Sequence, residues 1–200
     1  MGRIAVDVAL LPDEAMTDRA IEINRRLITS GRPEIVLGRE NHLPHISLAM
    51  GCLDETEVQT IRKRLEDIAR TTPVKTLQVV GVIGSINSRG EITSLLEVER
   101  TPELQTLHQE VMEEMRPFFR YDVTEAMIYD DAVAPSTLDW IRTYREKAGY
   151  EHFCPHITVG YGRVPAGPAF PIPFTVTRLA LCHLGNHCTC RRVLAAARIA

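Results

Sequence analysis

One short sequence occurs twice in this chain, and it limits how the chain can fold and act. Residues 44–51 read Pro-His-Ile-Ser-Leu-Ala-Met-Gly, and residues 155–162 read Pro-His-Ile-Thr-Val-Gly-Tyr-Gly. In both copies a histidine and a hydroxyl-bearing residue stand two positions apart, so on an extended strand both side chains project from the same face. Two such strands facing each other would place two imidazoles and two hydroxyls around one cleft.

Length and composition fit a single domain. The chain has 200 residues, 44% of them apolar, which suffices for one core or for two small lobes that share a core. With 23 basic and 26 acidic residues it lacks the basic excess of proteins that coat long nucleic acids, whereas a small phosphate ligand or a single RNA end remains compatible. We find no secretory signal, no apolar run of membrane-spanning length and no secreted disulfide pattern, so we expect a cytoplasmic protein.

The order of the expected elements indicates an α+β fold. Apolar spacing and capping residues predict four helices, over residues 14–30, 54–68, 101–116 and 135–147. Alternating apolar residues predict eight strands, over residues 3–11, 44–51, 74–86, 91–98, 122–129, 154–161, 175–184 and 188–199. Hairpin turns are expected at residues 87–90 and 185–186. Strands and helices that do not alternate regularly favour α+β over a parallel α/β sheet.

The paired motif suits the cleavage of a phosphodiester. Histidine gains and loses a proton near neutral pH, so two histidines in one cleft can act as complementary acid and base. One imidazole would deprotonate the attacking hydroxyl or water, and the other would protonate the departing ribose oxygen. A hydroxyl two residues along the strand could donate to a phosphate oxygen and stabilise the charge of the transition state. A single copy would be a weak signal, but two copies in near-identical context are specific.

The motifs His45-Ile-Ser-Leu and His156-Ile-Thr-Val resemble the double His-x-Ser/Thr-x signature of the two-histidine phosphoesterases, also called the 2′-5′ RNA ligase-like superfamily. The strand and Thr-Pro-Glu-Leu helix of residues 91–108 and the closing hairpin extend this resemblance over most of the chain. The resemblance implies that residues 1–200 form a single domain of two interleaved, pseudo-symmetric lobes. Two antiparallel sheets would face a central cleft, with the helices outside.

The same resemblance implies an activity and its site residues. The activity is metal-independent hydrolysis of 2′,3′-cyclic or 2′-5′-linked ribose phosphodiesters, in a nucleotide or at an RNA end, by a monomer without a cofactor. His45 and His156 would be the catalytic pair, and Ser47 and Thr158 would hold the phosphate. Which histidine is the base stays open. Two alternatives also stay open: a ligase that joins RNA ends through 2′-5′ linkages, and a non-catalytic protein that binds RNA ends or nucleotides.

The residues just beyond the two motifs depart from the closest bacterial members of the family. Five positions after the motif histidines this chain has Met50 and Tyr161, where that branch tends to have an aromatic residue and an arginine, respectively. Arg163 follows two positions after Tyr161. We expect all three to line the substrate site. Tyr161 could stack on a base or donate to phosphate, or it could be a packed aromatic residue.

The other histidines allow simpler interpretations. His42 and His152 precede the motif histidines and could line the mouth of the cleft, although exposed loop histidines are the simpler interpretation. His108 lies on the apolar side of an expected helix, so it is expected to pack in the core.

Cysteine and histidine are dense in one run near the C-terminus, which contains Cys182, His183, His187, Cys188 and Cys190. With a two-residue turn at Gly185-Asn186, His183 would pair with Cys188 and share a sheet face with Cys190, which would make a three-ligand zinc site possible. The spacing matches no standard zinc finger and shows no fourth ligand, so we expect no metal and interpret the cysteines as buried apolar residues. Alternatively, this face could line the substrate pocket.

Overall fold

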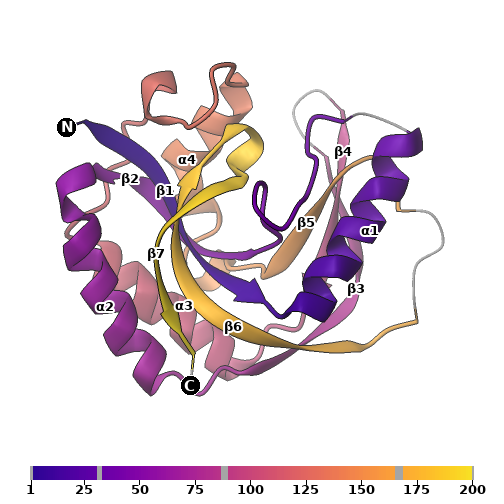
Figure 1. Ribbon diagram of the computed structural model, residues 1–200, viewed down its shortest axis with the longest axis horizontal. Helices are drawn as coiled ribbons and strands as arrows, with labels where there is room; N and C mark the ends of the chain where they lie inside the picture. The colour runs from indigo at the N-terminus through magenta and orange to yellow at the C-terminus, as the bar shows by residue number, and fades with distance from the viewer. Residues whose placement is uncertain (1, 31–32, 87–89, 165–168, 200) are drawn as a thin grey trace.

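The computed structural model describes residues 2–30, 33–86, 90–164 and 169–199 (Figure 1). Within them, the chain forms four α-helices: α1 (Glu14–Ser30), α2 (Val58–Thr71), α3 (Pro102–Met115) and α4 (Pro135–Lys147). The strands are β1 (Arg3–Pro12), β2 (Ile46–Asp54), β3 (Thr76–Ile86), β4 (Ile92–Val98), β5 (His156–Tyr161), β6 (Ile172–Leu184) and β7 (Cys190–Arg198). The expected α+β class is confirmed, with an antiparallel sheet and four helices.

All seven strands belong to one antiparallel sheet, in the order β2-β1-β6-β3-β4-β5, with β7 also paired to β6. The first residues of β6 pair with β3, as in Phe174 opposite Leu77, whereas its later residues lie between β1 and β7. The expectation of two separate sheets is therefore wrong. The reason is the length of β6, whose 13 residues continue from one half of the sheet into the other and hydrogen-bond to both. The division into two lobes stays a prediction.

The two motif strands, β2 and β5, are the terminal strands of this order. Each carries a bulge at the same place in its motif. Ser47 and Ala49 pair with consecutive residues of β1, and Thr158 and Gly160 pair with consecutive residues of β4, so Leu48 and Val159 are each an extra residue in the ladder. The repeat in the sequence is thus also a repeat in the pattern of strand pairing.

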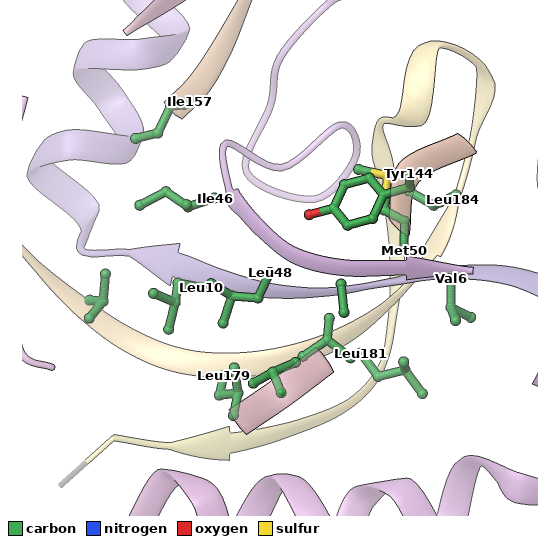
Figure 2. Packing of buried hydrophobic residues seen from close by; sticks show 14 of the residues in the cluster. Val6, Leu10, Ile46, Leu48, Met50, Tyr144, Ile157, Leu179, Leu181 and Leu184 are labelled. Carbon is green, nitrogen blue, oxygen red and sulfur yellow. The ribbon is translucent and has the colours of Figure 1, made fainter. Parts of the chain in front are cut away.

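Buried hydrophobic residues lie on both faces of the sheet. Figure 2 shows Leu179 and Leu181 of β6 on the opposite side of the strands from Tyr144, and all three are buried. Helix α2 packs on β6 and β7, and α3 packs on β2, while α1 lies beside β5 and α4 beside β2 (Figure 1). None of the described helices has both the length and the apolar character needed to cross a membrane.

Local sequence explains where the helices begin. In α1, the amide of Met16 donates to the Asp13 carboxylate at 2.9 Å, and in α3 the amide of Leu104 donates to the Thr101 hydroxyl at 3.2 Å. These caps satisfy amides that have no partner inside the helix. The stripe of Ile61, Leu65 and Ile68 along α2 is buried, as its spacing predicts.

One predicted strand is wrong. Residues 122–129 form no strand and contain only a short 3-10 turn, Glu125–Met127. Apolar alternation alone does not make a strand, which also needs a neighbour for its backbone groups. Here the backbone meets the sheet only at isolated points, as where Arg120 bridges to Cys52 and where the Tyr129 amide donates to the Leu184 carbonyl at 2.9 Å. The carbonyl of Val123 accepts from the Arg142 guanidinium instead. The expected turn at residues 87–90 lies mostly outside the described residues.

Candidate active site

The two motifs line one pocket with a cavity volume of about 270 Å³. Its wall includes all four expected chemical groups, those of His45, Ser47, His156 and Thr158, and also Met50 and Tyr161. Arg163 is exposed beyond the end of β5 and is not among the lining residues, contrary to expectation. The pocket brings together residues from opposite ends of the sheet order.

Both motif histidines are held in the same way. Nδ1 of His45 lies 2.7 Å from the carbonyl oxygen of Leu43, and Nδ1 of His156 lies 2.7 Å from that of Cys154. A carbonyl can only accept, so each Nδ1 carries a hydrogen. In the neutral ring Nε2 is then the proton acceptor. Each strand thus fixes the ring and the tautomer of its histidine by one short local contact.

Burial makes both imidazoles weaker bases than usual. Burial, together with a smaller effect of the nearby His156, lowers the pKa of His45 to about 4, against the opposing effect of the contact with Leu43. Burial also lowers the pKa of His156, again against its backbone contact. Both rings are therefore neutral at pH 7. A bound phosphodiester anion would raise both pKa values, because it stabilises the protonated form.

Asp7 is a member of the site that the sequence analysis missed. Its side chain is fully buried in β1, its Oδ2 accepts a 2.7 Å hydrogen bond from the Ser47 hydroxyl, and the same oxygen lies 3.6 Å from Nε2 of His45. Burial raises the pKa of this carboxyl well above its usual value, although the hydrogen bond from Ser47 acts the other way. The signal was present: one aspartate inside an otherwise apolar strand, Arg3–Pro12.

Helix α4 supplies a second group of lining residues that was not predicted. Trp140, Tyr144 and Lys147 line the pocket and lie four and three residues apart, which places them on one face of the helix. The Trp140 and Tyr144 rings meet edge to face, with centroids 6.2 Å apart. Tyr144 is buried, whereas Trp140 is 38% exposed, so its indole is available to a ligand.

Tyr161 belongs to the pocket wall and is half-buried. Its hydroxyl lies 2.9 Å from Nδ1 of His187, and the two rings meet nearly at right angles. His187 and Cys188 both have positive φ angles, 57° and 54°, which are uncommon for residues other than glycine. This contact joins the second motif to the turn between β6 and β7.

Three further histidines lie in different environments. His152 is exposed and lines the pocket, in agreement with the mouth position considered above. His42 is half-buried outside the pocket lining, where it contacts the Val36 carbonyl and the Arg191 guanidinium. The expected core position of His108 is confirmed, since its buried ring stacks on Phe153 at a centroid distance of 4.0 Å.

The zinc site considered for His183, Cys188 and Cys190 is wrong. The turn is longer than two residues, because Asn186–Cys188 form a 3-10 turn and the Gly185 amide donates to the Thr189 carbonyl at 2.8 Å. His183 therefore pairs with Arg192 and Leu184 with Cys190. His183 and Cys190 then project to opposite faces of the sheet, and Nε2 of His183 contacts the Met127 carbonyl. All five cysteines are free thiols, and Cys188 lines the pocket.

Comparison with known proteins identifies a family and a fold. The model of the 2′-5′ RNA ligase superfamily matches residues 30–187. No curated protein matches the chain. The crystal structure of TT0787 from Thermus thermophilus has a TM-score of 0.56 at 15% identity, with 98% of both chains covered. A crystal structure of a phosphoesterase (TM-score 0.49, 15% identity) and that of E. coli LigT complexed with 3′-AMP (TM-score 0.48, 16% identity) also cover 98% of both chains.

Proposed function

Because the chain belongs to the 2′-5′ RNA ligase superfamily of two-histidine phosphoesterases, we propose that it hydrolyses 2′,3′-cyclic or 2′-5′-linked ribose phosphodiesters, in a nucleotide or at an RNA end, without a metal ion. One observation carries this proposal: His45 and His156 line the same pocket, and each Nδ1 is held by a carbonyl oxygen 2.7 Å away. Each ring is then left with Nε2 as its position for proton transfer.

The reaction would proceed by in-line displacement at phosphorus. The neutral histidine takes a proton from water, and the resulting hydroxide forms the new bond to phosphorus. The bond from phosphorus to one ribose oxygen breaks, and the protonated histidine gives its proton to that oxygen. The products are a phosphomonoester and a free ribose hydroxyl. We assign His45 as the base, since burial lowers its pKa to about 4 and leaves Nε2 without a proton, and His156 as the acid.

The hydroxyls of Ser47 and Thr158 would donate to the non-bridging phosphate oxygens, one from each motif strand. Donors of this kind act most strongly as charge builds up in the transition state. Beyond the phosphate, the exposed indole of Trp140 would stack on a base, and the Lys147 ammonium would attract the negative charge of the substrate. One side of the pocket would thus bind the phosphate, and the side formed by α4 would bind the nucleoside.

Replacing either motif histidine tests the proposal. His45→Ala and His156→Ala should each reduce hydrolysis of a panel of 2′,3′-cyclic nucleotides and 2′-5′ dinucleotides by roughly 10²–10⁴-fold, the usual contribution of an acid or base. Circular dichroism would show whether the fold is retained. His42→Ala is the matched control, since this histidine lies outside the pocket lining, and it should remain active.

Full activity in either motif variant would overturn the proposed mechanism. Wild-type activity should also persist in excess EDTA, and a chelator-sensitive reaction would contradict the metal-free step. Nucleotides that bind but are never cleaved across the panel would favour a binding protein instead.

A further inference from the structure

Three potential metal ligands meet beside the first motif. Asp7 from β1, His45 just before β2 and Cys190 at the start of β7 each offer one ligand atom, and these atoms all lie within 4.8 Å of one another. We call them the Asp7–His45–Cys190 cluster. It is distinct from the zinc site considered above, because it contains a carboxyl and a motif histidine and excludes His183. It combines oxygen, nitrogen and sulfur donors, a set that suits zinc.

The environment of these side chains favours the binding of a cation, because a buried carboxyl oxygen otherwise has no partner. Asp7 and Cys190 are fully buried, and Asp7 has no salt bridge to lysine or arginine among the described residues. Its Oδ1 is buried and has no hydrogen-bond partner in the described part of the chain. A buried polar atom of this kind is costly unless something satisfies it. A bound cation would do so, and the Ser47 hydroxyl could still donate to Oδ2.

His45 is already oriented as a metal-binding histidine would be. Its Nδ1 is held by the Leu43 carbonyl, which fixes the ring and leaves the lone pair of Nε2 available. Nε2 lies 3.6 Å from Oδ2 of Asp7, close to the separation of two ligands in a tetrahedral zinc site. Because His45 also lines the pocket, a fourth coordination position would face the pocket interior.

We propose that the Asp7–His45–Cys190 cluster binds a thiophilic divalent cation, Zn²⁺, and that bound zinc inhibits the hydrolytic reaction. The inhibitory half rests on the proposed function. Zinc would take the lone pair of Nε2 that His45 needs to accept a proton. Formation of the zinc–sulfur and zinc–oxygen bonds would release to solvent the thiol proton of Cys190 and the proton held by the buried Asp7 carboxyl. A single oxygen ligand makes the cluster unsuitable for Mg²⁺ or Ca²⁺, which require several.

Cobalt reports directly on this cluster, because a thiolate bound to Co²⁺ gives a charge-transfer absorption band. The full chain, first treated with EDTA and dialysed, would be titrated with Co²⁺ and then with Zn²⁺. We expect the band in the wild type, its loss in Cys190→Ala, and displacement of Co²⁺ by Zn²⁺. Cys52→Ala is the matched control: it removes a fully buried thiol of the same sheet that lies outside the cluster, and it should retain the band. Asp7→Asn gives a second test if Cys190→Ala does not fold.

Inhibition is measured on the same samples. Saturating Zn²⁺ should abolish hydrolysis by the wild type and by Cys52→Ala, and it should leave Cys190→Ala active. A wild type without the band, or a band that persists unchanged in Cys190→Ala, would overturn the metal site. A band without inhibition would overturn the inhibitory role alone. If no nucleotide is hydrolysed, the proposed function fails, while the absorption band still decides whether the cluster binds metal.

Discussion

The two motif strands carry a bulge at the same place, but they differ in the backbone at the residue after it and in what faces them. In each, a carbonyl holds Nδ1 of the histidine, and the ladder has an extra residue just after the hydroxyl. At the next paired position, Met50 lies opposite Asp7, whereas Tyr161 lies opposite Thr93. His45 therefore has a buried carboxyl at 3.6 Å, and no such carboxyl contact is found for His156 within the described residues.

This difference suits the chemistry. An acid and a base that work together must hold different numbers of protons at the same pH, and two identical surroundings would give them identical pKa values. The repeated strand supplies the common geometry, whereas burial and the nearby His156 lower the pKa of His45 to about 4, and burial lowers that of His156. Asp7 and Thr93, which lie opposite Met50 and Tyr161, are the paired positions at which the two halves of the site diverge.

Removing the hydroxyl of either motif strand should lower the catalytic rate strongly. Ser47→Ala and Thr158→Val should each lower kcat by roughly 10²-fold, since each removes one donor to a phosphate oxygen. Ser85→Ala is the control, because it removes a pocket-lining hydroxyl outside the motifs. A loss of activity in Thr158→Val with none in Ser47→Ala would mean that Ser47 serves only Asp7, to which it donates at 2.7 Å.

The glycine of the second motif allows a test of how the backbones of the two motif strands differ. Gly160 has a φ of +122°, and a Cβ there would lie 3.0 Å from Nδ2 of Asn24, whose amide joins α1 to β5. We expect Gly160→Ala to lower the free energy of unfolding by about 1–3 kcal/mol, from strain and displacement of Asn24. The corresponding residue of the first motif is Ala49, and Ala49→Gly should cost only about 0.5–1 kcal/mol. Equal costs in urea denaturation would contradict the difference between the two bulges.

The smallest expected effect concerns the dependence of the rate on pH. The pH of maximal activity should be shifted to a lower value, without a loss of activity at that maximum. Burial lowers both histidine pKa values below 6.5, that of His45 to about 4. Below about pH 4, His45 is protonated and cannot accept a proton; above the pKa of His156, that ring has lost the proton it must donate. The rate profile of kcat/KM should therefore be bell-shaped, with its maximum below about pH 6.5. A maximum above about pH 7 would show that the buried environment does not control these groups.

Much of the fold could be predicted from the sequence, because it depends on local patterns. Apolar spacing located all four helices and the seven strands that formed, and proline, aspartate and threonine indicated where helices begin. Two features were not local. The strand predicted at residues 122–129 formed no ladder with a neighbouring strand, and β6 continued through both halves of the sheet because of pairing with β1, β3 and β7.

The candidate site was also predicted only in part. The four motif residues were visible as a repeat, and the pocket contains them. Asp7 was visible as a charge in an apolar strand, but its contact with Ser47 depends on the register of β1 and β2, including the bulge. The lining residues of α4 depend on how that helix packs beside β2. Contacts that arise from register and packing cannot be read from spacing.

The central claim is that the two histidines act as one acid–base pair on one phosphorus atom. A double-mutant cycle tests this most directly, with hydrolysis of a 2′,3′-cyclic nucleotide measured for the wild type, His45→Ala, His156→Ala and the double variant. Residues that act as a unit give strongly non-additive losses, so the double variant should be about as slow as the slower single variant. A double variant whose loss equals the product of the two single losses would mean that the histidines act independently, and it would contradict the account.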